Sequence, residues 1–267
     1  MLNANILSDN DKFVKLRDIL PLYVMRSIFR SALGDDDQLW IEHGLGRLRK
    51  EQGALSVAFD EPLVVAAANR WFNAKSDRSY AYFAESIGLH GNGGSTNGFE
   101  NYTVYCLHLI FGAEKERKLR DVFKFRGREE PQWPKKRAKL VSVYVPSTGS
   151  HSADEPNIED VKHGQFTGPS AMLGTYTDTA EKTLQWLAHG SRTPFCFPCR
   201  NMGPDVIFVL ELDNRKRIWV ALQVKYSKPN GNKFLDKSKL EHAVKSVTPE
   251  HFFRNKVCGE TYIVKSN

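Results

Sequence analysis

Residues 203–226 decide the fold, and they read Gly203-Pro204-Asp205-Val206-Ile207-Phe208-Val209-Leu210-Glu211-Leu212, a polar turn, then Ile218-Trp219-Val220-Ala221-Leu222-Gln223-Val224-Lys225-Tyr226. Two runs of β-branched and aromatic residues around a polar turn predict a hairpin of two buried strands. An aspartate starts the first strand, and a glutamine and a lysine two apart end the second. Because residues two apart on a strand share a face, Gln223 and Lys225 are expected to project together toward Asp205.

The register of this hairpin provides a geometric test. Directly opposed residues of an antiparallel pair share a face, so Asp205 must oppose Gln223 or Lys225 and not Val224. This requires an odd number of loop residues, or a bulge that corrects the register. Glu211 shares the face of Asp205, but six residues of strand place it about 20 Å away, too far to share one ion.

Composition and charge narrow the classes of protein. The chain has 267 residues, 41% of them hydrophobic, which is enough for one large domain or two small ones with a real core. The net charge of +7 favours an anionic partner such as nucleic acid. Basic residues concentrate in two segments, 114–139 and 215–256, which would contact a DNA backbone; for the first segment, a solvated helix face plus a loop is the alternative.

Other local patterns are read as structural. Cys196 and Cys199 form a lone C-x-x-C without a second ligand pair, so they are interpreted as thiols at a strand end and not as a zinc site. The glycine-rich stretch 91–98 lacks the residues of a phosphate-binding loop and is interpreted as a flexible loop. No apolar run has the length of a membrane span and no signal peptide is evident, so an intracellular protein, nuclear or cytoplasmic, is expected.

The first part of the chain, residues 1–145, is predicted to be mainly helical. Apolar periodicity and capping residues indicate helices over 11–33, 35–49, 60–68 and 99–111, followed by a strand over 140–145. Residues 146–175 are poor in large apolar groups and rich in Ser, Gly, Pro and Asp, so they are predicted to be a linker or a long surface loop.

From residue 176 to 267 the pattern is more regular. It predicts a helix over 177–189, strands over 195–198, 205–212 and 217–226, a helix over 235–253 and a last strand over 260–265. The element order is therefore αβββαβ. The predicted fold class is α/β, with a central mixed sheet flanked by helices.

This order and the residues of the hairpin resemble the PD-(D/E)XK nuclease superfamily, whose fold is restriction-endonuclease-like. The resemblance covers residues 176–267 and implies a Mg²⁺- or Mn²⁺-dependent phosphodiesterase. It assigns metal binding to Asp205 and Gln223, with a main-chain carbonyl at Val224 as a further ligand. It also gives Lys225 the task of positioning the attacking water, and lets Glu181 on the preceding helix match a glutamate that many members carry.

One departure from the family pattern keeps a second function open. Gln223 stands where the superfamily carries Asp or Glu, and an amide oxygen can ligate Mg²⁺ but brings no negative charge. The alternative is a catalytically inactive, nuclease-like module that acts as an effector or binds DNA or protein. Each residue also has a plain interpretation: a turn acid for Asp205, a strand polar residue for Gln223, a strand-end lysine for Lys225 and a solvated glutamate for Glu181.

A more distant similarity links the chain to fungal proteins allied to the Crinkler and RHS-type effector families. It rests on three short stretches, residues 98–102 (Gly-Phe-Glu-Asn-Tyr), 121–125 (Asp-Val-Phe-Lys-Phe) and 132–134 (Gln-Trp-Pro). A kinase-like effector is disfavoured because the glycine-rich and catalytic-loop motifs of kinases are absent. DNA is favoured over RNA as the partner, and a homodimer would suit cleavage of both strands.

Overall fold

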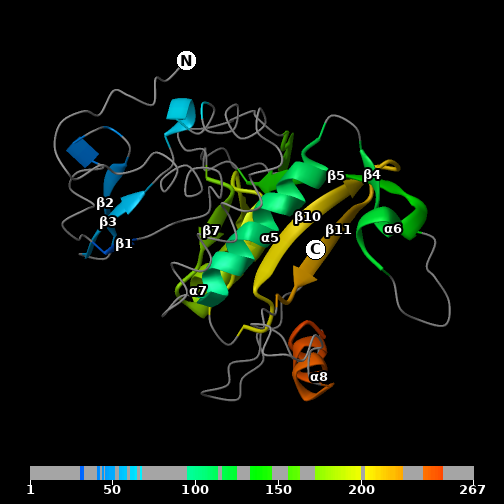
Figure 1. Ribbon diagram of the computed structural model, residues 1–267. Coiled ribbons are helices and arrows are strands. Elements are labelled where there is room, and N and C mark those ends of the chain that lie inside the picture. Colours follow the sequence, from blue (N-terminus) through cyan, green and yellow to red (C-terminus); the bar gives the residue numbers. More distant parts are fainter. Residues whose placement is uncertain are drawn as a thin grey trace. The chain divides into compact units, whose positions relative to one another are not determined.

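The computed structural model of the chain describes residues 31–32, 41–42, 44, 46–51, 54–58, 61–64, 67, 95–113, 116–124, 133–145, 156–162, 172–199, 202–224 and 237–248. The chain divides into two compact units, one of residues 1–102 with 169–171 and the other of residues 103–168 with 172–267. Each unit has its own sheet (Figure 1). The protein is thus a mixed α/β chain.

The first unit contains a three-stranded antiparallel sheet in the order β1-β3-β2. Its strands are β1 (Ser31–Ala32), β2 (Arg47–Glu51) and β3 (Ala54–Ala58), and Glu51 pairs with Ala54. Two expectations are therefore wrong: the helix over 11–33 does not hold at residues 31–32, and the helix over 35–49 gives way to a strand at residue 47. Residues 62–64 and 67 are helical, as predicted for 60–68.

The second unit is built on an eight-stranded mixed sheet with the path β4-β5-β10-β9-β7. Strands β11 and β10 pair with each other, and β6 and β8 both pair with β5. All the pairings are antiparallel except β7 with β9, which is parallel. The strands are β4 (Arg117–Lys118), β5 (Arg137–Tyr144), β6 (Asn157–Asp160), β7 (Gly174–Tyr176), β8 (Gly190–Ser191), β9 (Phe195–Phe197), β10 (Val206–Leu212) and β11 (Arg217–Leu222).

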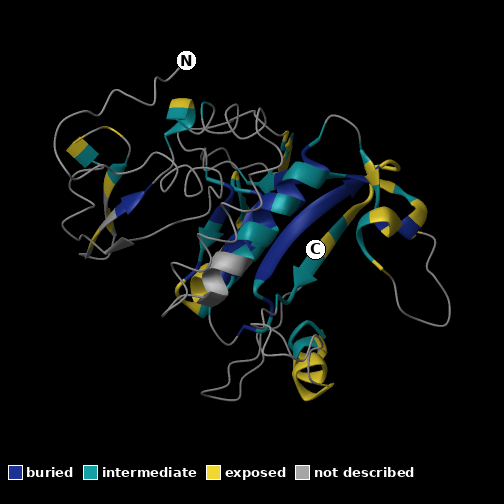
Figure 2. Cartoon of the chain, viewed as in Figure 1, coloured by how far each residue is buried: buried dark blue, intermediate teal, exposed yellow. Residues whose placement is uncertain are grey.

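Strand β10 is central to the core of this unit, and every residue in it is buried (Figure 2). A strand covered on both faces has a continuous apolar run, whereas β11 alternates between exposed and half-buried residues along its first four positions. Val206, Phe208 and Leu210 enter the main core together with Val104, Leu107 and Phe111 of α5 (Ser95–Phe111). The sheet therefore buries one face against the part of α5 that belongs to this unit (Figure 1).

Helix α7 (Ala180–His189) covers part of the opposite face. Trp186 of this helix is buried against Cys196 and Ile207, and Leu187 packs on the same cluster. The helix ends at Gly190, whose φ of 67° is in the left-handed region. A Cβ built there would lie 1.7 Å from the carbonyl oxygen of Val143, so only glycine lets β8 approach β5 this closely.

Three more expectations differ from the structure. Helix α5 begins at Ser95, so the second half of the predicted loop 91–98 is helical, as the Ser-Thr pair at an N-terminus allows. The predicted linker 146–175 contains β6 and the first residues of β7. Residues 1–145 include strands β1 to β5 as well as helices, among them the short α6 (Leu119–Val122) and the 3₁₀ turn η1 (Trp133–Lys135).

In the described part of residues 176–267, the expected elements are present, but the two-residue strand β8 was not expected and β11 ends at Leu222, before the expected end of that strand. Strands β9, β10 and β11 and helix α7 lie within or close to their expected ranges, and α8 (Lys237–Ser246) lies within the helix expected over 235–253. The final strand, expected over 260–265, lies outside the described residues.

Candidate functional site

Asp205 and Gln223 meet at the open end of the β10–β11 hairpin. Val206 pairs with Leu222, so one step farther along both strands sets Asp205 against Gln223. The Nε2 group of Gln223 donates a hydrogen bond to Oδ2 of Asp205. The expectation was that Asp205 opposes Gln223 or Lys225 and not Val224; the regular pairing ends at Val206 and Leu222, and beyond it the side chain of Asp205 is bonded to that of Gln223.

The turn of the hairpin produces this register. The N–H of Arg215 donates to the carbonyl oxygen of Leu212 (2.9 Å), and the N–H of Leu212 donates to that of Lys216 (2.8 Å). Three residues therefore lie between Leu212 and Lys216, the odd number that a shared face requires. Arg215 has a φ of 64°, the left-handed conformation that closes a three-residue turn of this kind.

The pair lies on the face of the sheet that α7 covers. Leu222 and Val220 pack against the main core on the α5 side, so alternation places Gln223 on the opposite face. Trp219 of β11 shares that face and meets Trp186 of α7 edge to face, with ring centroids 6.1 Å apart. Trp219 remains 51% exposed, so an aromatic surface is open to solvent along β11, which ends one residue before Gln223.

Asp205 receives main-chain as well as side-chain donors. The N–H of Val224 donates to Oδ2 of Asp205 (2.7 Å), and the N–H of Asp205 donates to the carbonyl oxygen of Leu222 (2.9 Å). Val224 was expected to offer its main-chain carbonyl to a metal ion. In the structure it is the main-chain N–H of Val224 that contacts the Asp205 carboxylate. These bonds hold the half-buried carboxylate between the ends of two strands.

Gln223 has a second partner that the sequence did not indicate. The hydroxyl of Ser246, in the last turn of α8, donates to Oε1 of Gln223 and lies 2.7 Å from the carbonyl oxygen of Ala243. Ser246 is 23 residues away along the chain. A serine in a predominantly polar helix has no local pattern that would connect it with the glutamine.

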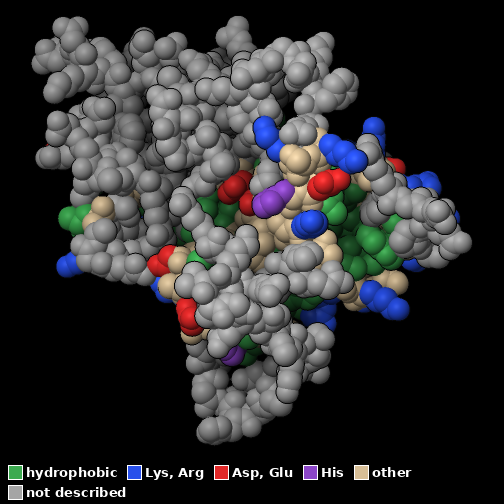
Figure 3. All heavy atoms as spheres, turned by 90° about the horizontal axis from the view of Figure 1, so that it is seen from below, with side chains coloured by type: hydrophobic (Ala, Val, Ile, Leu, Met, Phe, Trp, Pro, Cys, Tyr) green, Lys and Arg blue, Asp and Glu red, His purple; other side chains and the backbone are tan. Residues whose placement is uncertain are grey.

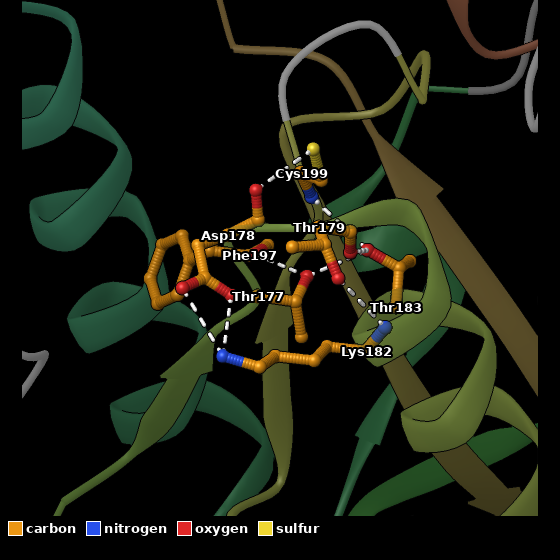
Figure 4. Close-up of polar contacts among 7 residues, drawn as sticks. All are labelled: Thr177, Asp178, Thr179, Lys182, Thr183, Phe197 and Cys199. Carbon is orange, nitrogen blue, oxygen red and sulfur yellow. Dashed lines mark hydrogen bonds and ion pairs between the residues drawn. The ribbon is translucent and has the colours of Figure 1, made fainter. Parts of the chain in front are cut away.

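Glu181 is exposed in the first turn of α7, on the face of the sheet where Asp205 lies. Thr179 caps this turn by accepting a hydrogen bond from the N–H of Lys182 (3.2 Å), and Lys182 pairs with Asp178 (2.8 Å) (Figure 4). Burial, followed by the charges of Asp178 and Glu181, raises the pKa of the Cys199 thiol. The structure therefore places Glu181 near Cys199.

The two cysteines of the C-x-x-C stretch belong to the framework of this turn. Burial raises the pKa of Cys196 to about 12, although a hydrogen bond with Thr177 opposes the shift. Cys199 donates its thiol to the carbonyl oxygen of Asp178 (3.3 Å), and its N–H donates to the hydroxyl of Thr183 (3.1 Å) (Figure 4). Burial therefore disfavours the thiolate form of both cysteines.

Lys225 lies outside the described residues, as do parts of both basic segments. Where those segments are described, several cations are paired: Lys139 with Asp160 (2.6 Å) and Glu211 (3.4 Å), and Lys136 with Asp213 (3.5 Å). On the face seen in Figure 3, basic and acidic side chains are interspersed. Within the described ranges, no three His, Cys, Asp or Glu side chains lie close enough together to form a metal-binding group.

In the described part of the chain, no helix combines the length and the apolar character needed to cross a membrane. Comparisons with known proteins add no assignment, since no family model, curated protein or solved structure matches the chain.

Proposed function

We propose that the chain is a Mg²⁺-dependent phosphodiesterase that acts on nucleic acid, DNA in preference to RNA, with a restriction-endonuclease-like core. The observation that carries the proposal is the hydrogen bond between the side chains of Asp205 and Gln223, directly beyond the last pair of the β10–β11 ladder. Both side chains are half-buried, so the pair is only partly exposed to solvent at the ends of the two strands. The described succession is α7-β8-β9-β10-β11-α8, which differs from the first five elements of the αβββαβ core by the two-residue strand β8.

The side chains present are compatible with a magnesium ion. Mg²⁺ prefers oxygen ligands, keeps several of its waters and is held by one or two protein groups in many sites. Asp205 supplies a carboxylate and Gln223 an amide oxygen, so the pair can provide two such ligands. A cluster of three acidic or imidazole groups is not required for this mode of binding.

The bound ion would offset charge on the phosphate and acidify a coordinated water. The chain's own residues would do the rest. Asp205, fixed by the N–H groups of Asp205 and Val224, would hold one ligand position rigidly at the end of β10. Lys225, two residues beyond Gln223 in the sequence, would hold the attacking water and stabilise charge that develops on the phosphate. Glu181 on α7 would add a carboxylate on the same side of the sheet.

The inactive, nuclease-like module has one observation in its favour. The amide of Gln223 presents a donor to Asp205, and its oxygen accepts from Ser246, so the pair is satisfied without a cation. A protein that had lost metal chemistry but kept the fold for binding would retain such a bond. The two proposals therefore differ in whether a cation replaces the hydrogen bond between the Gln223 amide and Asp205.

A cleavage assay separates them. Supercoiled plasmid, linear duplex and single-stranded DNA and RNA are incubated with the chain in Mg²⁺, Mn²⁺ or EDTA. Asp205→Asn and Lys225→Ala are expected to abolish metal-dependent cleavage, as a loss of about 10² or more in rate. Matched controls are Asp121→Asn and Lys162→Ala, which remove exposed charges elsewhere.

Cleavage by Asp205→Asn or Lys225→Ala at the wild-type rate would refute the proposed site. No cleavage of any substrate by the wild-type chain, combined with retained DNA binding, would favour the inactive module.

A further inference from the structure

The hydroxyl of Ser246 lies between two acceptors. One is Oε1 of Gln223 and the other is the carbonyl oxygen of Ala243, at 2.7 Å. A serine hydroxyl has a single proton, so it can donate to only one of them at a time. The N–H of Val247, which could have served Ala243 in a regular helix, donates instead to the carbonyl oxygen of Val244 (3.2 Å).

Exchanging the two ends of the Gln223 amide removes this conflict. With Nε2 turned toward α8, the amide donates to Oγ of Ser246, and the serine proton goes wholly to Ala243. Both groups of α8 are then satisfied, and two hydrogen bonds replace one. A serine hydroxyl can accept as well as donate, so either orientation of the amide has a partner there.

The same exchange turns Oε1 of Gln223 toward Oδ2 of Asp205. Two oxygens that face each other repel, and the hydrogen bond between Gln223 and Asp205 is lost. A cation shared by the two oxygens offsets that repulsion, and the N–H of Val224 continues to donate to Asp205. The orientation with nitrogen toward Asp205 thus suits a cation-free site, and the reverse suits an occupied one.

We propose that Ser246 is a positioning residue that allows the Gln223 amide to present nitrogen to Asp205 in the cation-free chain and oxygen when Mg²⁺ is bound. This rests on the proposed function, because it concerns the same cation. It explains how a glutamine can serve at a position where a carboxylate is the simpler ligand. It also links the end of β11 to the last turn of α8, since Mg²⁺ binding changes the acceptor of the Ser246 proton.

Calorimetric titration with MgCl₂, in the absence of nucleic acid, tests the role of Ser246. The occupied arrangement has one more hydrogen bond at Ser246 than the free one, so Ser246→Ala is expected to weaken Mg²⁺ binding about fivefold. Ser246→Thr keeps the hydroxyl and is expected to bind as the wild type does. Thr248→Val is the matched control, because the Thr248 hydroxyl contacts the carbonyl oxygen of Val244 and leaves Gln223 untouched.

A second measurement follows the amide itself. The chain has six glutamines, Gln38, Gln52, Gln132, Gln165, Gln185 and Gln223, so selective ¹⁵N-glutamine labelling gives a simple side-chain NMR spectrum. The Gln223 signals are identified by their loss in Gln223→Met. They are expected to shift on addition of Mg²⁺, because their acceptor changes from a carboxylate to a hydroxyl, while the signals of Gln185 on α7 stay in place.

The outcomes distinguish the two proposals. Measurable Mg²⁺ binding that is equally tight in wild type and Ser246→Ala, or that leaves the Gln223 signals in place, overturns the inference and leaves the proposed function intact. Absence of Mg²⁺ binding in the wild type overturns both. If Ser246→Ala does not fold, Ser246→Cys replaces it, and as a weaker acceptor it is expected to bind Mg²⁺ less tightly than Ser246→Thr.

Discussion

Replacing Gln223 by Glu is the most informative single change at the candidate site. In the absence of divalent cations it removes the donor that faces Asp205 and sets a second carboxylate against the first. A hydrogen bond to a charged group contributes about 1.5–3 kcal/mol. Two like charges about 4 Å apart repel by about 1 kcal/mol in water and about 4 kcal/mol at an effective dielectric constant of 20.

Both side chains are only half-buried, so the lower part of these ranges applies. The Gln223→Glu chain is therefore expected to be less stable than wild type by about 3 kcal/mol at pH 7 in EDTA. For a chain of this size that is a fall in Tm of roughly 6–12 °C. Mg²⁺ should reverse the loss, since two carboxylates bind a divalent cation more tightly than one carboxylate and an amide.

The assay is thermal unfolding in EDTA and in a series of Mg²⁺ concentrations. A cation present at a hundred times its Kd stabilises the folded chain by about 2.7 kcal/mol, enough to restore most of the lost Tm. Gln185→Glu is the control, because it makes the same change of charge at an exposed position of α7. If Gln223→Glu is as stable as the control in EDTA, or gains no more from Mg²⁺ than wild type does, the opposed pair is not a cation site.

Three further expectations concern the framework around the site. Gly190→Ala should cost at least about 2 kcal/mol in urea unfolding, because the new methyl group meets a β5 carbonyl oxygen and the backbone has a positive φ; a neutral effect would contradict the close approach of the strands. Burial raises the pKa of Cys196 to about 12 from an ordinary value of 9.0, so as the pH rises the thiol ionises in the unfolded chain before it ionises in the folded chain. The free energy of unfolding should therefore fall between those pH values, and the fall should be steeper in wild type than in Cys196→Ala. Lys139→Met leaves Glu211, whose side chain is 6% exposed, with one exposed arginine partner, and should lower the free energy of unfolding by about 2 kcal/mol. Lys136→Met removes one member of an exposed pair and should lower it by under about 1 kcal/mol. Equal losses would show that burial of the acid does not matter.

The hairpin was predictable because its two signals are local. A continuous apolar run indicates a strand buried on both faces, and β10 has that run from Val206 to Leu210. The side-chain period of two then fixes which polar residues share a face, and the three residues between Leu212 and Lys216 set the register. These rules need no knowledge of the rest of the chain.

The errors have equally local causes. Residues 47–51 and 54–58 form a hairpin with only residues 52 and 53 between them, and the glycine at 53 is the turn signal that a helical interpretation ignored. Strand β6 is short, polar and at an edge, where Ile158 is 40% exposed. A strand with so little apolar surface has no periodicity to detect, so residues 146–175 resemble a linker in composition.

The contact of Gln223 with Ser246 could not be predicted, because it depends on where α8 packs. Strand pattern identifies the side chains that meet, but an amide carries a donor at one end and an acceptor at the other. Whether Gln223 acts as a metal ligand or as a partner of Asp205 is therefore an energetic question. It depends on the hydrogen bond to the carboxylate, about 1.5–3 kcal/mol, set against the free energy of cation binding.

That competition has a consequence for the proposed activity. A cation must displace the bond between Gln223 and Asp205 before both oxygens can bind it, and a displaced bond of about 1.5–3 kcal/mol weakens apparent affinity roughly 10- to 100-fold. The extra hydrogen bond formed at Ser246 offsets part of the free energy that is lost with the Gln223–Asp205 bond. Half-maximal cleavage by wild type should consequently need a higher Mg²⁺ concentration than cleavage by Gln223→Glu, and Ser246→Ala should need more still. If the three proteins rank in this order of Mg²⁺ requirement both in cleavage and in Mg²⁺ titration, the Gln223 amide sets the metal requirement. A reversed order would mean that Gln223 is not a ligand.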